Sequence, residues 1–172
     1  MNIRKIGSKY VYFHTVFLNK SYSFILDDFR KEFPGIFIQG VNFDIVYNYE
    51  HIYEILKISN FAKKRNIMCS NKIELDFLLR IVGTNQISQA INKGGLKINN
   101  YAIFVLVATR KQLEEIKQKL IDLFGNSNEE ILLDHEIKKR KFEKLKRIGN
   151  NPTLEEKNLI KFLKEIGALI TI

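Results

Sequence analysis

Hydrophobic and polar residues alternate along this chain with two periods, which separate strands from helices. Residues 3–19 and 36–47 are rich in aromatic and β-branched side chains, as strands are. Residues 101–108 form an almost continuous apolar run, which is typical of a strand buried on both faces, so we expect it to be central in a sheet. Gly7 suits a turn in the first segment, and Gly40 a bend or bulge in the second.

Apolar residues three and four positions apart predict amphipathic helices in the rest of the chain. The predicted helices cover residues 23–33, 49–65, 74–82, 84–93, 109–124, 129–148 and 153–166. Two of them begin with a capping-box pattern, in which Thr109 precedes Gln112 and Thr153 precedes Glu156. We expect Gly167 to end the last helix, because glycine is common at helix C-termini.

Length and composition favour a single folded domain. With 172 residues, 45% of them hydrophobic, the chain can bury a core without disulfides, and Cys69 is its only cysteine. We therefore expect one α/β domain over residues 1–172, with a central mixed β-sheet covered by about seven helices. The N-terminus lacks a signal-peptide pattern and no apolar run could span a bilayer, so we expect a soluble cytoplasmic protein with no membrane partner.

The chain is strongly basic, with 28 Lys and Arg residues against 19 Asp and Glu residues and a formal net charge of +9. Such an excess attracts polyanions, so nucleic acid is a natural partner. A lysine-rich surface in a protein encoded by an AT-biased genome explains the same charge equally well. Composition alone leaves both interpretations open.

The segment ELDFLLRIVGTNQISQAINKGGL, residues 74–96, predicts two short helices that meet at a Gly-Thr corner. Gly83 suits the end of the first helix, and Thr84 can cap free N–H groups of the second. We expect Gly94 and Gly95 to stop the second helix by adopting positive φ. The apolar stripes are Leu75, Leu78, Leu79 and Val82 in the first helix, and Ile87, Ala90 and Ile91 in the second.

This segment resembles the PRPK-binding-protein (TPRKB) family of accessory subunits of the KEOPS complex. The features shared with the family are a glutamate that opens a leucine-rich helix, a Gly-Thr-x-Gln-Ile corner, an Ala-Ile pair and a glycine-containing turn before a strand. The residues that carry them are Glu74, Leu75, Leu78, Leu79, Gly83, Thr84, Gln86, Ile87, Ala90 and Ile91. The resemblance extends over residues 48–107 and more loosely to the C-terminus, whereas the first 45 residues agree only in element order.

The resemblance implies a non-catalytic subunit of the complex that makes the N6-threonylcarbamoyl modification (t6A) on adenosine 37 of tRNA. Such a subunit binds the small atypical kinase-like ATPase subunit directly and supports its activity. It reaches the threonylcarbamoyl transferase only through that ATPase, and it recruits tRNA through the single-stranded 3′ CCA end. No cofactor and no metal is expected.

Two groups of residues are the candidates for these contacts. For tRNA, cations would neutralise phosphates and the polar corner would hydrogen-bond bases or sugar hydroxyls. These residues are Lys63, Lys64, Arg65, Lys72, Arg80, Thr84, Asn85 and Gln86. For the kinase-like subunit we expect an apolar patch made by Phe162, Leu169, Ile170 and Ile172, although this tail could instead pack into its own core.

Other functions remain open from the sequence. A stand-alone basic nucleic-acid-binding regulator could use residues 138–147, in which seven of ten residues are basic, or the helix pair as a helix-turn-helix. We favour a solvated helix face, opposite Phe142, Leu145 and Ile148, as the explanation of that basic run. An enzyme is the weakest alternative, because His14, His51 and His135 are far apart in the sequence and no nucleophile or phosphate-loop motif is present.

Overall fold

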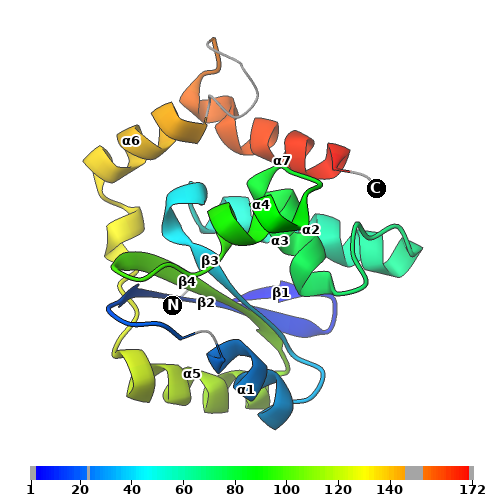
Figure 1. Cartoon of the computed structure of the whole chain (residues 1–172), viewed down its shortest axis with the longest axis vertical. Coiled ribbons are helices and arrows are strands. Elements are labelled where there is room, and N and C mark those ends of the chain that lie inside the picture. Colours follow the sequence, from blue (N-terminus) through cyan, green and yellow to red (C-terminus); the bar gives the residue numbers. More distant parts are fainter. Residues whose placement is uncertain (1–2, 23, 146–152, 171–172) are drawn as a thin grey trace. The chain divides into compact units, whose positions relative to one another are not determined.

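The computed structural model describes residues 3–22, 24–145 and 153–170 (Figure 1). Its chain divides into two compact units. The sheet unit comprises Met1–Phe43 and Leu96–Glu129, and the helical unit comprises Asp44–Gly95 and Glu130–Ile172. The predicted α/β class is confirmed.

The sheet has four strands in the order β1-β2-β4-β3, and every neighbouring pair is antiparallel. The strands are β1 Arg4–Ile6, β2 Lys9–Leu18, β3 Phe37–Asn42 and β4 Asn100–Ala108. The prediction of a mixed sheet is therefore wrong. β4 is central, as predicted, and its residues 102–108 are all buried. An unbroken apolar run indicates burial on both faces, but it says nothing about strand direction.

One face of the sheet packs on α1, Ile25–Glu32, and α5, Arg110–Phe124 (Figure 1). Alternate residues of the strands point to this face. Phe104 of β4 is fully buried there, together with Phe29 of α1 and Ile116 of α5. The predicted capping box forms at the start of α5, where the Thr109 side chain accepts from the Gln112 backbone N–H and the Gln112 side chain accepts from the Thr109 backbone N–H.

The helical unit contains the other five α-helices of the described residues. They are α2 Tyr49–Arg65, α3 Ile73–Val82, α4 Ile87–Gly94, α6 His135–Leu145 and α7 Leu159–Leu169. Short 3-10 turns lie at Phe43–Ile45, Glu130–Leu132 and Glu156–Asn158. α2 packs against α3 and α7, and α3 also contacts α4. The bounds of α2 agree with the predicted helix over residues 49–65.

Three glycines act differently from the predictions, because they allow close packing instead of a bend or a stop. Gly40 lies in the regular β3–β4 register without a bulge, and a Cβ there would lie 2.4 Å from a Leu96 side-chain atom. Gly94 is inside α4, where a Cβ would lie 2.6 Å from Val82 Cγ2. Gly167 lies inside α7 and does not end it.

Further details of the helix ends also differ from the predictions. Gly95 follows α4 with a φ of −72°, so neither glycine of the pair uses the left-handed region. The Thr153 capping box does not start α7, which begins at Leu159. The predicted helix over residues 129–148 is a 3-10 turn followed by α6, and its last three residues lie outside the described ranges.

Candidate nucleic-acid and partner interface

The basic end of α2 provides the most exposed group of predicted tRNA ligands. Asn48 caps the start of this helix by accepting from the His51 N–H at 2.9 Å, and Asn66 ends it in the left-handed region with φ of 55°. Lys63, Lys64 and Arg65 lie in the last turn and are all exposed. The helix dipole favours cations at this end, and their side chains are available to phosphates.

An exposed aromatic ring lies beside these cations. Phe61 has 55% of its surface exposed, and the Arg65 guanidinium carbon lies 5.4 Å from the centre of its ring. Stacking of this kind keeps Phe61 on the surface next to positive charge. Nucleic acid bases use such exposed rings as stacking platforms.

Phe61 is part of the wall of a cavity of about 660 Å³ within the helical unit, which we call the α2–α7 pocket. Its walls come from the C-terminal half of α2, the link to α3, Arg80, and the end of α7. The lining residues are Glu54, Lys57, Ile58, Phe61, Ala62, Asn66, Ile67, Met68, Arg80, Lys164, Ala168 and Ile170. Its size lies within the ~300–1,000 Å³ typical of ligand sites.

Charged side chains at the edge of the α2–α7 pocket form a small network. Glu54 accepts hydrogen bonds from Lys57 and Lys164, each at 2.7 Å. Burial raises the pKa of Glu54, but the two lysines outweigh it and leave that pKa below its usual value. Two ammonium groups against one ionised carboxylate give this edge a positive excess.

Arg80 is not on the surface, although it is one of the cations predicted for tRNA. Only 4% of it is exposed, and its guanidinium Nε and Nη2 bond both carboxylate oxygens of Asp76, at 2.9 and 3.2 Å. Nη1 donates to the carbonyls of Gly167 and Ile170 at 2.9 and 3.1 Å. Arg80 therefore ties α3 to the end of α7, and its donors are used within the protein.

The first half of the Gly-Thr corner, where Gly83 ends α3, forms as predicted. Gly83 ends α3 with φ of 74°, and its N–H and that of Thr84 bond carbonyls of the last turn. Thr84 Oγ1 accepts from the Gln86 N–H at 3.2 Å, whereas Gln86 itself is the first residue before α4. Asn85 and Gln86 are exposed and Thr84 is half-buried.

The predicted tRNA ligands fall into two groups at opposite ends of α3. Lys72 is exposed at the start of this helix, seven positions after Arg65, and Thr84 follows its end. At 1.5 Å per residue the ten-residue helix separates them by about 15 Å. One small ligand therefore cannot contact both groups.

The second helix of the pair differs from its predicted packing. Only Ala90 of its apolar stripe is buried, whereas Ile87 and Ile91 are 49% and 56% exposed. α4 is also only eight residues long. These isoleucines give its outer face an apolar character that is unlike a helix made to enter a DNA groove.

The residues predicted for the kinase-like partner are partly exposed. Leu169 is 78% exposed, and Phe162 lies seven positions earlier on the same side of α7. Phe162 is partly buried against a core cluster that is made by Tyr47, Leu145, Leu159 and Leu163. The Ile170 carbonyl accepts from Arg80 and its side chain lines the α2–α7 pocket. Ile172 lies outside the described residues.

The lysine-rich helix α6 is not uniformly solvated. Lys139 and Arg140 are exposed, but Lys141 is 5% exposed and its Nζ donates to the Val46 carbonyl at 2.8 Å. Burial lowers the pKa of Lys141 to about 7. The basic face of α6 is therefore narrower than the sequence suggests, and residues 146 and 147 lie outside the described ranges.

The histidines and Cys69 do not form a common site in the part of the chain that the structure describes. His14 belongs to the sheet unit, and His51 and His135 to different helices of the helical unit. Burial lowers the pKa of His14 to about 4 and that of His51 to about 3, so both are neutral. Burial raises the pKa of the Cys69 thiol. Within the described residues no group of histidine, cysteine and acidic side chains could hold a metal.

Sequence reasoning missed Phe61, Lys57 and Lys164. The signal was present, because Phe61 lies outside the apolar stripe of α2, and an aromatic residue on the polar side of an amphipathic helix is a candidate contact.

None of the helices in the described ranges combines the length and the apolar character needed to cross a bilayer. Neither the protein-family models nor the curated proteins gave a match to this chain.

Proposed function

We propose that this chain is a non-catalytic accessory subunit of a KEOPS complex, working in the cytoplasm. In this proposal the chain recruits tRNA through the 3′ CCA end of the RNA. It also binds the small atypical kinase-like ATPase subunit and supports the activity of that subunit. The chain reaches the threonylcarbamoyl transferase only through this ATPase. The named complex comes from the sequence resemblance over residues 48–107. The observation that carries the RNA-binding part is the exposed ring of Phe61, beside three exposed cations and on the wall of the α2–α7 pocket.

Physical chemistry explains why this surface suits a single-stranded RNA end. The bases of an unpaired end are unstacked, so they can stack on aromatic rings, while their phosphates bind lysine and arginine. Phe61 offers the ring, and Lys63, Lys64 and Arg65 offer the charges. Duplex RNA would not present free base faces to Phe61.

Two triple variants with the same change in charge separate this surface from the basic helix α6. One replaces Lys63, Lys64 and Arg65 by glutamine, and its matched control replaces Lys138, Lys139 and Arg140 by glutamine. The first should make the negative slope of log K against log salt for tRNA shallower by up to ~2, at ~0.7 per phosphate contact, and the control should leave it almost unchanged. The reverse pattern would favour a stand-alone nucleic-acid-binding regulator that uses α6.

The aromatic contact has a separate test. Phe61→Ala should weaken binding to tRNA by about 1–3 kcal/mol, which is the usual contribution of one stacked base. Phe24→Ala is the control, because Phe24 is also exposed but belongs to the sheet unit. Equal effects of the two replacements would exclude Phe61 as a specific stacking platform.

The end of α7 is the surface proposed for the kinase-like subunit. Leu169→Glu should reduce co-purification with this subunit, since it puts a charge into an exposed apolar contact. Leu133→Glu is a matched control in the same unit, because Leu133 is 70% exposed on a different segment. Unchanged co-purification of Leu169→Glu would move the partner surface away from α7.

A further inference from the structure

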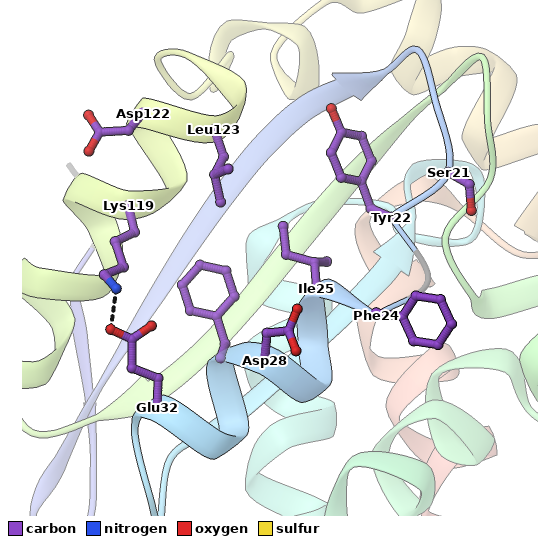
Figure 2. Close-up of a pocket in the computed structure, with 10 residues that line it drawn as sticks. Ser21, Tyr22, Phe24, Ile25, Asp28, Glu32, Lys119, Asp122 and Leu123 are labelled. Carbon is purple, nitrogen blue, oxygen red and sulfur yellow. Dashed lines mark hydrogen bonds and ion pairs between the residues drawn. The ribbon is translucent and has the colours of Figure 1, made fainter.

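A second cavity, of about 590 Å³, lies in the sheet unit between α1 and α5 (Figure 2). We call it the α1–α5 pocket. It is lined by Ser21, Tyr22, Phe24, Ile25, Asp28, Phe29, Glu32, Lys119, Asp122 and Leu123. None of these residues belongs to the surface proposed for tRNA or for the kinase-like subunit.

The interior of the α1–α5 pocket is apolar and aromatic. Leu123 points from α5 toward α1 in Figure 2, and Ile25 lies opposite it. The Tyr22 ring is held in place by an edge-to-face contact with Phe124, with 4.6 Å between the ring centres. Leu123 and Phe24 are 52% and 77% exposed, so a ligand with an apolar body would cover surface that now faces solvent.

Three of the residues that line this pocket are carboxylates and one is a cation. Lys119 is its one lining cation, and an ion pair with Glu32 occupies it (Figure 2). Asp122 accepts from the Gln118 amide at 2.8 Å and points away from the other labelled side chains. Asp28 has a more distant ion-pair partner, Lys31, at 3.9 Å, and both side chains are more than two-thirds exposed. Asp28 can therefore accept a ligand cation.

One ring of the pocket wall already has an ammonium group of the chain beside it. The Nζ of Lys20 lies 5.5 Å from the centre of the Tyr22 ring, in a cation–π contact. The negative face of an aromatic ring attracts ammonium groups, and this attraction adds to that of a nearby carboxylate. Carboxylates, aromatic rings and an apolar interior together are what an amine with an apolar body requires.

We propose that the α1–α5 pocket binds a small organic cation, an aliphatic or arylalkyl amine. Its ammonium group pairs with Asp28, and its apolar body lies between Ile25 and Leu123. An anionic ligand gains no ion pair with Asp28 and binds more weakly than the amine. A neutral ligand of the same shape loses the ion pair and binds more weakly.

Titration of the full chain with 2-phenylethylammonium and with 2-phenylethanol, followed by amide NMR shifts, tests this proposal. The amine should shift the amides of Ile25, Asp28 and Leu123 in a saturable way and bind about tenfold more tightly than the alcohol, given the usual strength of an exposed ion pair and a cation–π contact. Equal affinities of the two compounds, or the absence of saturable shifts at these residues, would overturn it.

Two variants locate the charge that selects the amine. Asp28→Asn should weaken amine binding by about threefold to fivefold, as expected for an exposed ion pair, and leave alcohol binding unchanged. Asp27→Asn is the matched control, because Asp27 is the neighbouring residue of α1 but does not line the pocket. Leu123→Lys, which places an ammonium group at the pocket, should abolish amine binding. Amine affinity that survives both Asp28→Asn and Leu123→Lys contradicts the proposal.

Discussion

Replacing Arg80 by methionine should destabilise the protein strongly, because this residue is buried and ion-paired. Arg80 is 4% exposed and its partner Asp76 is 0% exposed. The replacement leaves the Asp76 carboxylate buried, with the Cys69 N–H donating to it at 2.7 Å. It also removes two donors from the carbonyls of Gly167 and Ile170. Breaking a buried ion pair from one side costs about 3–5 kcal/mol.

Urea unfolding at pH 7 measures this loss directly. With m values of about 1–3 kcal/mol per molar for proteins of this kind, the midpoint should fall by roughly 1–5 M. The double variant Asp76→Asn/Arg80→Met should recover about 1–2 kcal/mol, because it removes the uncompensated charge. Arg65→Met is the matched control: it removes the same charge from an exposed site and should change stability by less than about 0.5 kcal/mol. If the free energy of unfolding of Arg80→Met lies within about 1 kcal/mol of that of the original protein, the buried network of Arg80 and Asp76 does not stabilise the fold strongly.

Three further predictions concern the stability of the fold. Burial lowers the pKa of His51 from 6.5 to about 3, so the unfolded state binds the proton first as the pH falls. The free energy of unfolding should therefore decrease below pH 6.5 by up to ~1.4 kcal/mol per pH unit. In His51→Leu this part of the pH dependence should be missing between about pH 6.5 and 4.5, and identical pH slopes in the two proteins would contradict the prediction. Gly167→Ala should lower the free energy of unfolding by about 1 kcal/mol net, because the new Cβ would lie 2.5 Å from Ile55 Cδ1. Ile55→Val should reduce that loss in a double-mutant cycle, and strictly additive losses would exclude this contact as the cause. Thr109→Ala should lower the free energy of unfolding by about 1 kcal/mol, because it removes the capping box. An unchanged midpoint of thermal unfolding would show that the cap does not stabilise the fold.

Local patterns allowed most elements to be predicted from the sequence. α2 agrees in both bounds, because a regular apolar stripe and three cations at its end indicate the same helix. The capping box at Thr109 and the left-handed Gly83 follow from similar local chemistry. Signals of this kind depend on residues within one or two turns, so the sequence contains them completely.

Features that depend on packing between distant residues could not be predicted. Gly167 and Gly94 allow close contact with side chains of other helices, and a single sequence does not distinguish such a glycine from a helix stop. Strand direction depends on how the chain returns to the sheet, so a buried apolar run suggested a mixed sheet that is in fact antiparallel.

The candidate site was predictable only in part. The exposed cations at the end of α2 are where the sequence placed them, since a polar helix end normally faces solvent. Arg80 was expected among them because its charge suggested a surface position. Its burial depends on Asp76 one turn earlier and on the carbonyls of α7 almost ninety positions later, and only the first of these partners is visible in the local sequence.

Recruitment of tRNA through its 3′ CCA end is tested most directly by a comparison of two RNAs at two salt concentrations. Binding of the purified protein is measured to full-length tRNA and to the same tRNA without its 3′ CCA. If the chain recruits tRNA through this end, trimming should weaken binding at both salt concentrations, and the loss should be smaller in Phe61→Ala. Equal and strongly salt-dependent binding of both RNAs would contradict the claim, because it would leave only the attraction between a basic surface and phosphates.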